Sequence, residues 1–160
     1  MSMSQEELNE ELQQLGIDEG SYKMVALLPL VHVAWADGAV QASERTLILK
    51  IADKRGFADE AGAKVLESWL KDQPSPYFLH RGRKVLEELY DRQSGIGAEI
   101  DKAFLEDLLA FCEGVADSAG GVFGLFGRVA NEEKEAISKI AGALRVDPSK
   151  RWADVKSEFD

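Results

Sequence analysis

Cysteine and long apolar runs are scarce in this 160-residue chain, and each shortage excludes a class of protein. Cys112 is its one cysteine, so no disulfide can form within the chain and a reducing compartment is expected. No run reaches the roughly 18 apolar residues of a membrane-spanning helix, and the polar, acidic first residues do not resemble a signal peptide. We therefore expect a cytoplasmic protein that does not itself span a membrane, either fully in solution or peripheral to the inner face of the membrane.

Catalytic signatures and positive charge are also lacking. The chain contains no G-x-S-x-G, G-x-x-x-x-G-K-[ST], H-E-x-x-H or C-x-x-C motif, so we do not expect an enzyme. Its 19 Lys and Arg residues face 29 Asp and Glu residues, which gives a net charge of −10 and argues against nucleic acid as a partner. Residues 1–20 alone contain six carboxylates and no Lys or Arg, so the rest of the chain is only mildly acidic.

Apolar residues recur at helical spacing along the whole chain, and no segment alternates as a strand would. This pattern predicts an all-α, compact bundle of about seven to eight helices. Ser4, Asp59 and Ser75 are the expected N-caps of three of them, and Pro29 should kink the helix predicted over residues 21–36 or shift its start. We expect an acidic N-terminal helix or extension (1–20), a main helical domain (21–145) and a short C-terminal helix that packs on it (146–160).

An internal repeat gives the first functional hypothesis. With the residues after Asp117 looped out, residues 36–52 align with residues 116–141 at eight identical positions. The matched pairs are Ala36 and Ala116, Asp37 and Asp117, Val40 and Val129, Glu44 and Glu133, Ile48 and Ile137, Lys50 and Lys139, Ile51 and Ile140, and Ala52 and Ala141. Each copy predicts a helix, an Asp at its end, a turn, and a helix with Glu in its first turn. Two such hairpins can pack about a pseudo-twofold axis.

That packing would gather four carboxylates at one end of the bundle. Asp37, Glu44, Asp117 and Glu133 are the candidate ligands of a weak divalent-cation site, because calcium, magnesium and manganese prefer clustered carboxylate oxygens. Residues 37–44 also have the spacing of the second half of an EF-hand loop. Val33 and Trp35 stand where the first ligands would be, which excludes an intact EF-hand.

A second interpretation of the same residues stays open. Glu in a first helical turn stabilises the helix N-terminus, and Asp before Gly is favourable turn chemistry, with no metal involved in either case. His32 and Cys112 occupy equivalent positions of the two copies on the core-facing stripe. We interpret both as packing residues rather than ligands.

The first copy also carries a family resemblance. Ala34-Trp35-Ala36-Asp37-Gly38-Ala39-Val40, followed by Glu44-Arg45 and Ile48, resembles the A-x-A-D-G-x-V-x-x-x-E-R signature of the TerB-like tellurite-resistance family. The resemblance covers roughly residues 21–145. It implies a compact helical bundle with duplicated hairpins, acidic residues at the positions named above, and a non-enzymatic role in chemical stress, often near membrane-embedded partners. A similar domain occurs in membrane-anchored DnaJ-like co-chaperones.

The second copy departs from the family pattern by an insert over residues 119–127. Four glycines there alternate with Val122, Phe123, Leu125 and Phe126, which predicts a flexible loop with a large apolar surface. The loop either folds back over the end of the bundle or docks a protein partner, a second subunit or a membrane surface. The sequence therefore predicts a cation-binding module that docks a protein partner. The alternative is a pure interaction module that uses this loop and whose acidic residues serve only as helix caps.

Overall fold

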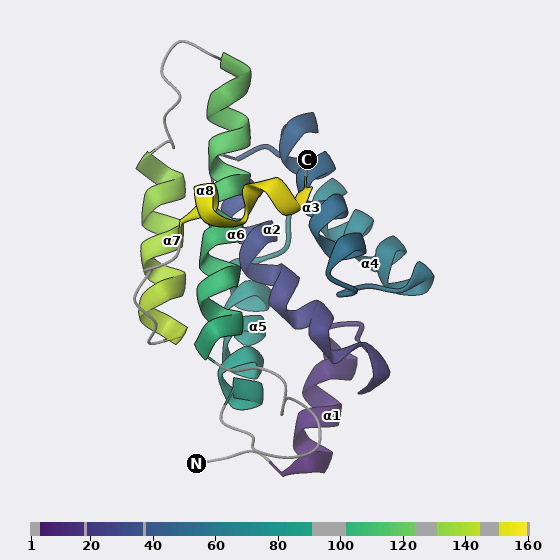
Figure 1. Cartoon of the computed structure of the whole chain (residues 1–160). Helices are drawn as coiled ribbons and strands as arrows, with labels where there is room; N and C mark the ends of the chain where they lie inside the picture. The colour runs from purple at the N-terminus through teal and green to yellow at the C-terminus, as the bar shows by residue number, and fades with distance from the viewer. Residues whose placement is uncertain are drawn as a thin grey trace.

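The computed structural model describes residues 4–17, 19–36, 38–90, 102–123, 131–144 and 151–159. Within these ranges every regular element is helical, so the predicted all-α bundle is confirmed (Figure 1). In chain order the elements are α1 (Gln5–Gln14), the 3₁₀ helix η1 (Glu19–Leu27), α2 (Leu28–Ala34), α3 (Ala42–Lys54), α4 (Glu60–Lys71), α5 (Pro76–Tyr90), α6 (Lys102–Phe123), α7 (Asn131–Leu144), α8 (Trp152–Val155) and the 3₁₀ helix η2 (Lys156–Phe159).

Local chemistry sets several of these boundaries. The side chains of Ser4 and Asp59 accept hydrogen bonds from backbone N–H groups in the first turns of α1 and α4, and Ser75 does the same for α5. Pro29 is the second residue of α2, where its missing N–H costs no intrahelical bond, so the helix begins at Leu28 and a 3₁₀ helix precedes it.

Helix α6 runs through the centre of the bundle, and the other helices of the two repeat hairpins, α2, α3 and α7, pack against it (Figure 1). In the first hairpin α2 contacts α3, and in the second α6 contacts α7. Between the hairpins α2 contacts α6, while α3 contacts α6 and α2 contacts α7. A twofold relation that exchanges α2 with α6 and α3 with α7 maps the α2–α3 contact onto α6–α7 and the α3–α6 contact onto α2–α7, and it leaves the α2–α6 contact unchanged. The helices therefore pack in the pattern that the repeat predicts.

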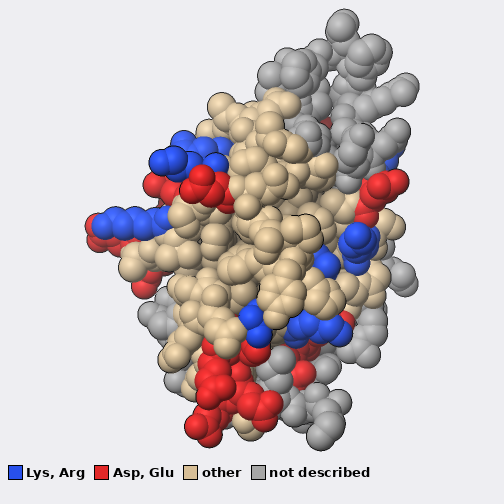
Figure 2. All heavy atoms as spheres, turned by 180° about the vertical axis from the view of Figure 1, so that it is seen from behind, with Lys and Arg blue, Asp and Glu red and all other residues tan. Residues whose placement is uncertain are grey.

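Helix α1 belongs to the same core as the rest of the bundle. Leu8 and Leu12 of this helix and its C-cap Leu15 are buried, and Arg81 of α5 donates a hydrogen bond to Glu11 at 3.2 Å. The opposite face of α1 is exposed and carries much of the negative charge, which gathers at the lower end of the molecule in Figure 2. This helix thus combines a buried leucine stripe with an acidic outer face.

Part of the insert is not a loop. Helix α6 continues to Phe123, so residues 119–123 are helical, and Asp117 lies inside the helix rather than at a turn. The sequence predicted that a helix ends at Asp117 and that residues 119–127 form a flexible loop. The first prediction was wrong, and the second was wrong for residues 119–123. A helix already formed over four turns extends at a cost of only about 1 kcal/mol per glycine, so Gly120 and Gly121 do not end it.

No helix in the described part of the chain combines the length and the apolar character needed to cross a bilayer.

Candidate functional site

The four acidic residues of the repeat differ in how far the structure places them. Glu44 is buried in the first turn of α3, and Asp117 is half-buried on α6. Asp37 lies outside the described residues. Glu133 lies in α7, but its side chain is outside the description. Of the candidate ligands, only two can therefore be compared in position.

Glu44 acts as a helix cap. Its Oε1 accepts a hydrogen bond of 2.9 Å from the backbone N–H of Gln41, and only 1% of the residue is exposed. This is the half of a capping box in which the N3 carboxylate satisfies the N-cap amide. One oxygen of Glu44 is therefore committed to α3 itself, as the capping interpretation expects.

A second hydrogen bond joins the two repeat copies. The hydroxyl of Ser43 donates to the backbone oxygen of Ser118 at 3.2 Å, so the start of α3 lies against α6 beside Asp117. The repeat thus brings residues adjacent to two of its acidic positions together. Among the described side chains, however, no three Asp, Glu, His or Cys residues lie close enough to hold a metal ion.

The four apolar residues predicted to dock a partner are also only partly described. Val122 and Phe123 lie on the last turn of α6, with side chains outside the description, and Leu125 and Phe126 lie outside the described residues. The structure therefore places the beginning of this apolar segment on a helix end.

The sole thiol sits where it cannot react. Cys112 is fully buried on α6, and desolvation raises its pKa well above the ordinary value, so it stays protonated. His32 is half-buried on α2. Nη1 of Arg83 lies 3.3 Å from its Nδ1, and because an arginine can only donate, Nδ1 is the acceptor and the ring is neutral.

His32 makes stability depend on pH. Burial, followed by the charges of Arg83 and Lys139, lowers its pKa from 6.5 to about 4. As pH falls from 6.5 towards 4, the unfolded chain takes up a proton that the folded chain does not. The contribution of neutral His32 to the free energy of unfolding is thus complete above pH 6.5 and is lost as pH falls from 6.5 towards 4. Between about pH 7 and about pH 5 we expect a loss of about 1 kcal/mol, discounted because the ring is partly exposed to water.

His32→Leu should flatten this pH dependence in urea unfolding curves, and His80→Leu, which changes an exposed histidine of α5, should leave it intact. Equal slopes for His32→Leu and the native chain would contradict the assignment.

The most elaborate contacts in the described chain lie elsewhere, at its C-terminal segment (residues 151–159). This segment crosses α6 and reaches α3 (Figure 1). Trp152 and Phe159 are buried and stack on each other with ring centroids 5.8 Å apart, and Phe159 meets the edge of Phe111 at 5.4 Å. The indole of Trp152 lies directly on Gly114, where an added Cβ would fall within 3.0 Å of three ring atoms. The absence of a side chain at Gly114 is what makes room for this ring.

Charged side chains hold both ends of the segment. At its start, Oε1 of Glu113 accepts from the backbone N–H of Trp152 at 3.2 Å, and Arg151 pairs with the same carboxylate. At its end, Nζ of Lys50 donates to the backbone oxygen of Phe159 at 2.8 Å, and Nζ of Lys54 donates to that of Glu158 at 2.9 Å. These are the unpaired N–H and C=O groups that every helix end leaves.

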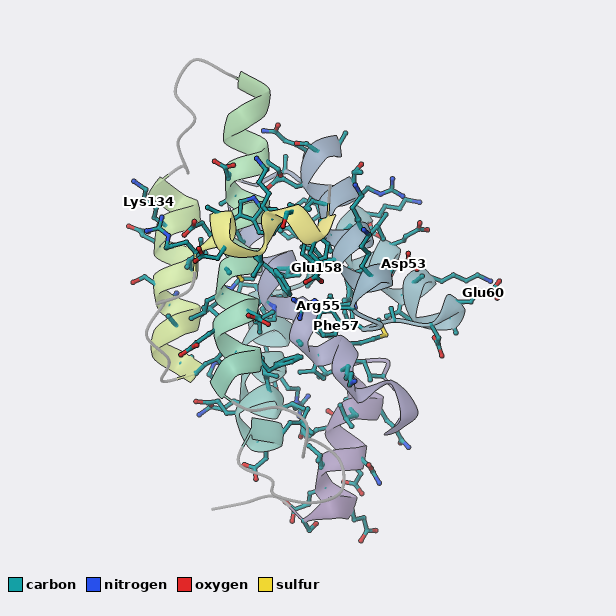
Figure 3. The ribbon with its side chains drawn as sticks, in the orientation of Figure 1. Asp53, Arg55, Phe57, Glu60, Lys134 and Glu158 are labelled. Atoms are coloured by element: carbon teal, nitrogen blue, oxygen red, sulfur yellow. The ribbon has the colours of Figure 1, made fainter. Side chains whose placement is uncertain are left out.

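One ion pair completes this end. Figure 3 shows Arg55 beneath the ribbon of the segment, close to the side chain of Glu158. Nη2 of Arg55 donates to Oε1 of Glu158 at 2.9 Å. Nη1 of Arg55 also donates to Asp107 at 3.3 Å, and its guanidinium lies 4.9 Å from the ring centroid of Phe111. The hydrogen bond that Arg55 donates to Glu158 is the largest of the contacts that raise the pKa of Arg55. We use the name α3–α6 groove for the surface on which the C-terminal segment lies. It is formed by Leu47, Lys50 and Lys54 of α3, its C-cap Arg55, and Asp107, Phe111, Glu113, Gly114, Asp117 and Ser118 of α6.

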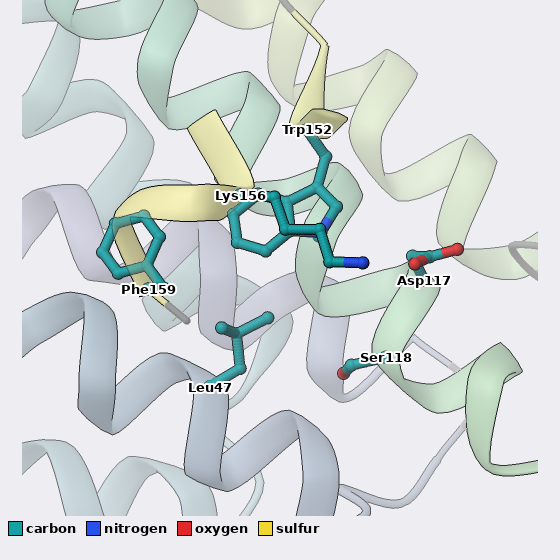
Figure 4. Close-up of a pocket in the computed structure, with 7 residues that line it drawn as sticks. Leu47, Asp117, Ser118, Trp152, Lys156 and Phe159 are labelled. Carbon is teal, nitrogen blue, oxygen red and sulfur yellow. The ribbon is translucent and has the colours of Figure 1, made fainter. Parts of the chain in front are cut away.

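The C-terminal segment leaves part of the groove open. A cavity of about 280 Å³ lies beside it (Figure 4). The α3–α6 groove contributes Leu47, Gly114, Asp117 and Ser118 to its lining, and the segment contributes Trp152, Lys156 and Phe159. Asp117, a candidate cation ligand, is thus also a wall of this cavity.

Sequence reasoning missed the groove. It predicted a short C-terminal helix packed on the main domain, but it gave no role to Lys54, Arg55 or Gly114. The available signal was Gly114 itself, because an isolated glycine within a helical pattern often marks a close approach of another chain segment. The partners of the basic residues are about a hundred positions away, so no local pattern shows them.

Comparisons of the chain with protein-family models, with curated proteins and with solved structures gave no match.

Proposed function

We propose that this chain is a non-enzymatic interaction module that binds a protein partner at the end of α6, in the stress-associated setting that its TerB-like resemblance implies. A membrane-embedded partner and a cytoplasmic location belong to the same proposal. Two observations support a role without covalent or acid–base chemistry. The thiol of Cys112 is buried and protonated, and Nδ1 of His32 accepts a hydrogen bond from Arg83.

The observation that carries the proposal is the length of α6. Its last turn, with Val122 and Phe123, extends past the neighbouring ends of α3 and α7 (Figure 1). At the upper end of the molecule, Figure 2 shows an area without Lys, Arg, Asp or Glu side chains. An apolar helix end beside an uncharged area is typical of a protein-docking surface.

The test removes the two phenylalanine rings of this segment. The pair Phe123→Ser and Phe126→Ser should leave the free energy of unfolding within about 1 kcal/mol of the native value, whereas loss of core phenylalanines would cost about 3–5 kcal/mol each. Capture of the partner by the immobilised full chain, followed by mass spectrometry, should fall at least tenfold. Tyr77→Ser, which removes the most exposed aromatic side chain of the described residues, is the matched control and should not reduce capture. A folded variant that captures the same proteins as the native chain would contradict the proposal.

Weak binding of a divalent cation is the second candidate. The hydrogen bond between Ser43 and Ser118 supports it, because this contact sets α3, with Glu44 in its first turn, beside Asp117. The candidate ligands at this position are Asp37, Glu44, Asp117 and Glu133, as the repeat predicts. Calcium, magnesium and manganese are the candidate ions.

Two tryptophans are placed to report such binding. Trp35 is two residues from Asp37 and is held by a hydrogen bond of 2.9 Å to the backbone oxygen of Trp69, while Trp152 lines the same cavity as Asp117. Titration with each ion should change tryptophan emission saturably. A range up to about 10 mM is sufficient, because weak calcium sites are half-filled near about 1 mM. The pair Asp37→Asn and Asp117→Asn should abolish the change, and Asp53→Asn on the exposed face of α3 should not. No saturable change, or one that survives in the double variant, would contradict cation binding.

A further inference from the structure

The α3–α6 groove holds its occupant largely by the features of a helix rather than by one sequence. Glu113 binds a backbone N–H at the start of the C-terminal segment, and Lys50 and Lys54 bind backbone oxygens at its end. Side chains that satisfy both ends of a short helix supply what a helix of four to eight residues cannot supply for itself.

Sequence preference enters at three positions of the segment. Trp152 lies on the bare backbone of Gly114, Phe159 lies against Phe111, and Glu158 pairs with Arg55. The occupant pattern is therefore an aromatic residue, six residues, and a second aromatic residue with a carboxylate directly before it.

The groove also accommodates more than this segment. The cavity of about 280 Å³ beside the segment is bounded by Leu47 on α3 and by Asp117 and Ser118 on α6. An occupant with a larger side chain at this point would bury further apolar surface against Leu47.

We propose that the α3–α6 groove is a binding site for a short amphipathic helix of another protein, and that the C-terminal segment is its resident competitor. The partner helix carries two aromatic residues seven positions apart and an acidic residue beside the second. The three cations of the groove, on Lys50, Lys54 and Arg55, provide the charge complementarity for its acidic C-terminal end. This surface is distinct from the end of α6, and the inference does not depend on docking there.

The competition has a measurable consequence. A partner can enter only the fraction of molecules in which the C-terminal segment has left the groove, so its apparent affinity is reduced by that fraction. Weakening the segment without altering the groove therefore raises the affinity for an external helix.

The experiment uses the full chain and a fluorescein-labelled peptide with the sequence of residues 151–159. Fluorescence anisotropy is compared between the native chain and Trp152→Ser with Phe159→Ser, in which only the segment changes. We expect at least tenfold tighter binding to this double variant. Adding Lys50→Ala and Lys54→Ala should remove the gain, whereas adding Lys64→Ala and Lys71→Ala on the exposed face of α4 should preserve it.

A second pair of substitutions keeps the test decisive if loss of the two aromatic residues unfolds the chain. Arg151→Ala and Glu158→Ala remove charged contacts at the two ends of the segment while leaving its rings, and they should tighten peptide binding about threefold to tenfold. No tighter binding to a folded variant, or equal binding of a peptide with both aromatic residues replaced by serine, would overturn the proposal. Sedimentation showing that the native chain dimerises by exchanging this segment would also overturn it, because a second copy would then be the occupant.

Discussion

Gly114→Ala is expected to lower the free energy of unfolding by about 1–2 kcal/mol, although alanine is the better helix former. The new Cβ would lie within 3.0 Å of three atoms of the Trp152 indole, a rigid ring that cannot bend away. Overpacking of this kind costs about 1–3 kcal/mol, and the gain in helix propensity returns about 1 kcal/mol at most. Thermal unfolding should shift down by about 2–8 °C, and hydrogen exchange in the C-terminal segment should accelerate more than in α7.

Two other glycines provide matched controls. Gly82→Ala in α5 brings the new Cβ closer than 3.0 Å to Cδ1 of Leu28, which is the tip of a flexible side chain, and Gly142→Ala in α7 meets nothing within 4 Å. We expect Gly82→Ala to be nearly neutral and Gly142→Ala to stabilise the chain by up to about 1 kcal/mol. A Gly114→Ala chain as stable as Gly142→Ala would contradict the seating of Trp152 on α6.

Phe111→Ala is expected to have the largest effect on stability, a loss of about 3–5 kcal/mol. The ring is 1% exposed and is among the largest fully buried side chains of the described residues. It meets the edge of Phe159 at 5.4 Å and lies 4.9 Å below the guanidinium of Arg55. Its removal therefore leaves a cavity and also takes away the support of the C-terminal segment. Chemical denaturation measures the loss.

Phe57→Ala is the control for this prediction. Phe57 is also buried and also meets another ring edge-on, Phe104 at 5.6 Å, but that pair does not include the C-terminal segment. Both variants should be destabilised. Only Phe111→Ala should increase the emission change of Trp152 below the main unfolding transition. The same early change in Phe57→Ala would indicate that the segment responds to any loss of core packing.

Short-range patterns predicted much of the fold. The N-caps at Ser4, Asp59 and Ser75 and the shifted helix start at Pro29 depend on contacts within about one helical turn, and the sequence displays such contacts directly. The predicted packing of the repeat hairpins follows from the similarity of their apolar faces. The extent of α6 was mispredicted, because glycines at 120 and 121 favour a loop by propensity while the preceding helix favours continuation.

The candidate site was less accessible to sequence reasoning. That Glu44 caps α3 was one of two open interpretations, since a carboxylate in the first turn suits a cap and a metal equally well. The groove around the C-terminal segment depends on pairs such as Lys50 with Phe159 and Glu113 with Trp152, whose proximity arises only when distant helices pack. A single sequence contains no local signal for such pairs.

The choice of backbone atoms by Lys50 and Lys54 has a consequence for divergence. Because these lysines bind main-chain oxygens of the C-terminal segment, substitution of its exposed residues Ala153, Asp154 or Ser157 would leave both contacts in place. The two ring positions have less freedom, since the indole of Trp152 lies on the bare backbone of Gly114 and the ring of Phe159 packs edge-on with Phe111. Related chains should therefore vary at exposed positions such as 153 and 157 while keeping the rings, their spacing, the carboxylate of Glu158 and the glycine opposite the first ring. The segment would then be recognisable by its spacing long after its sequence identity had been lost.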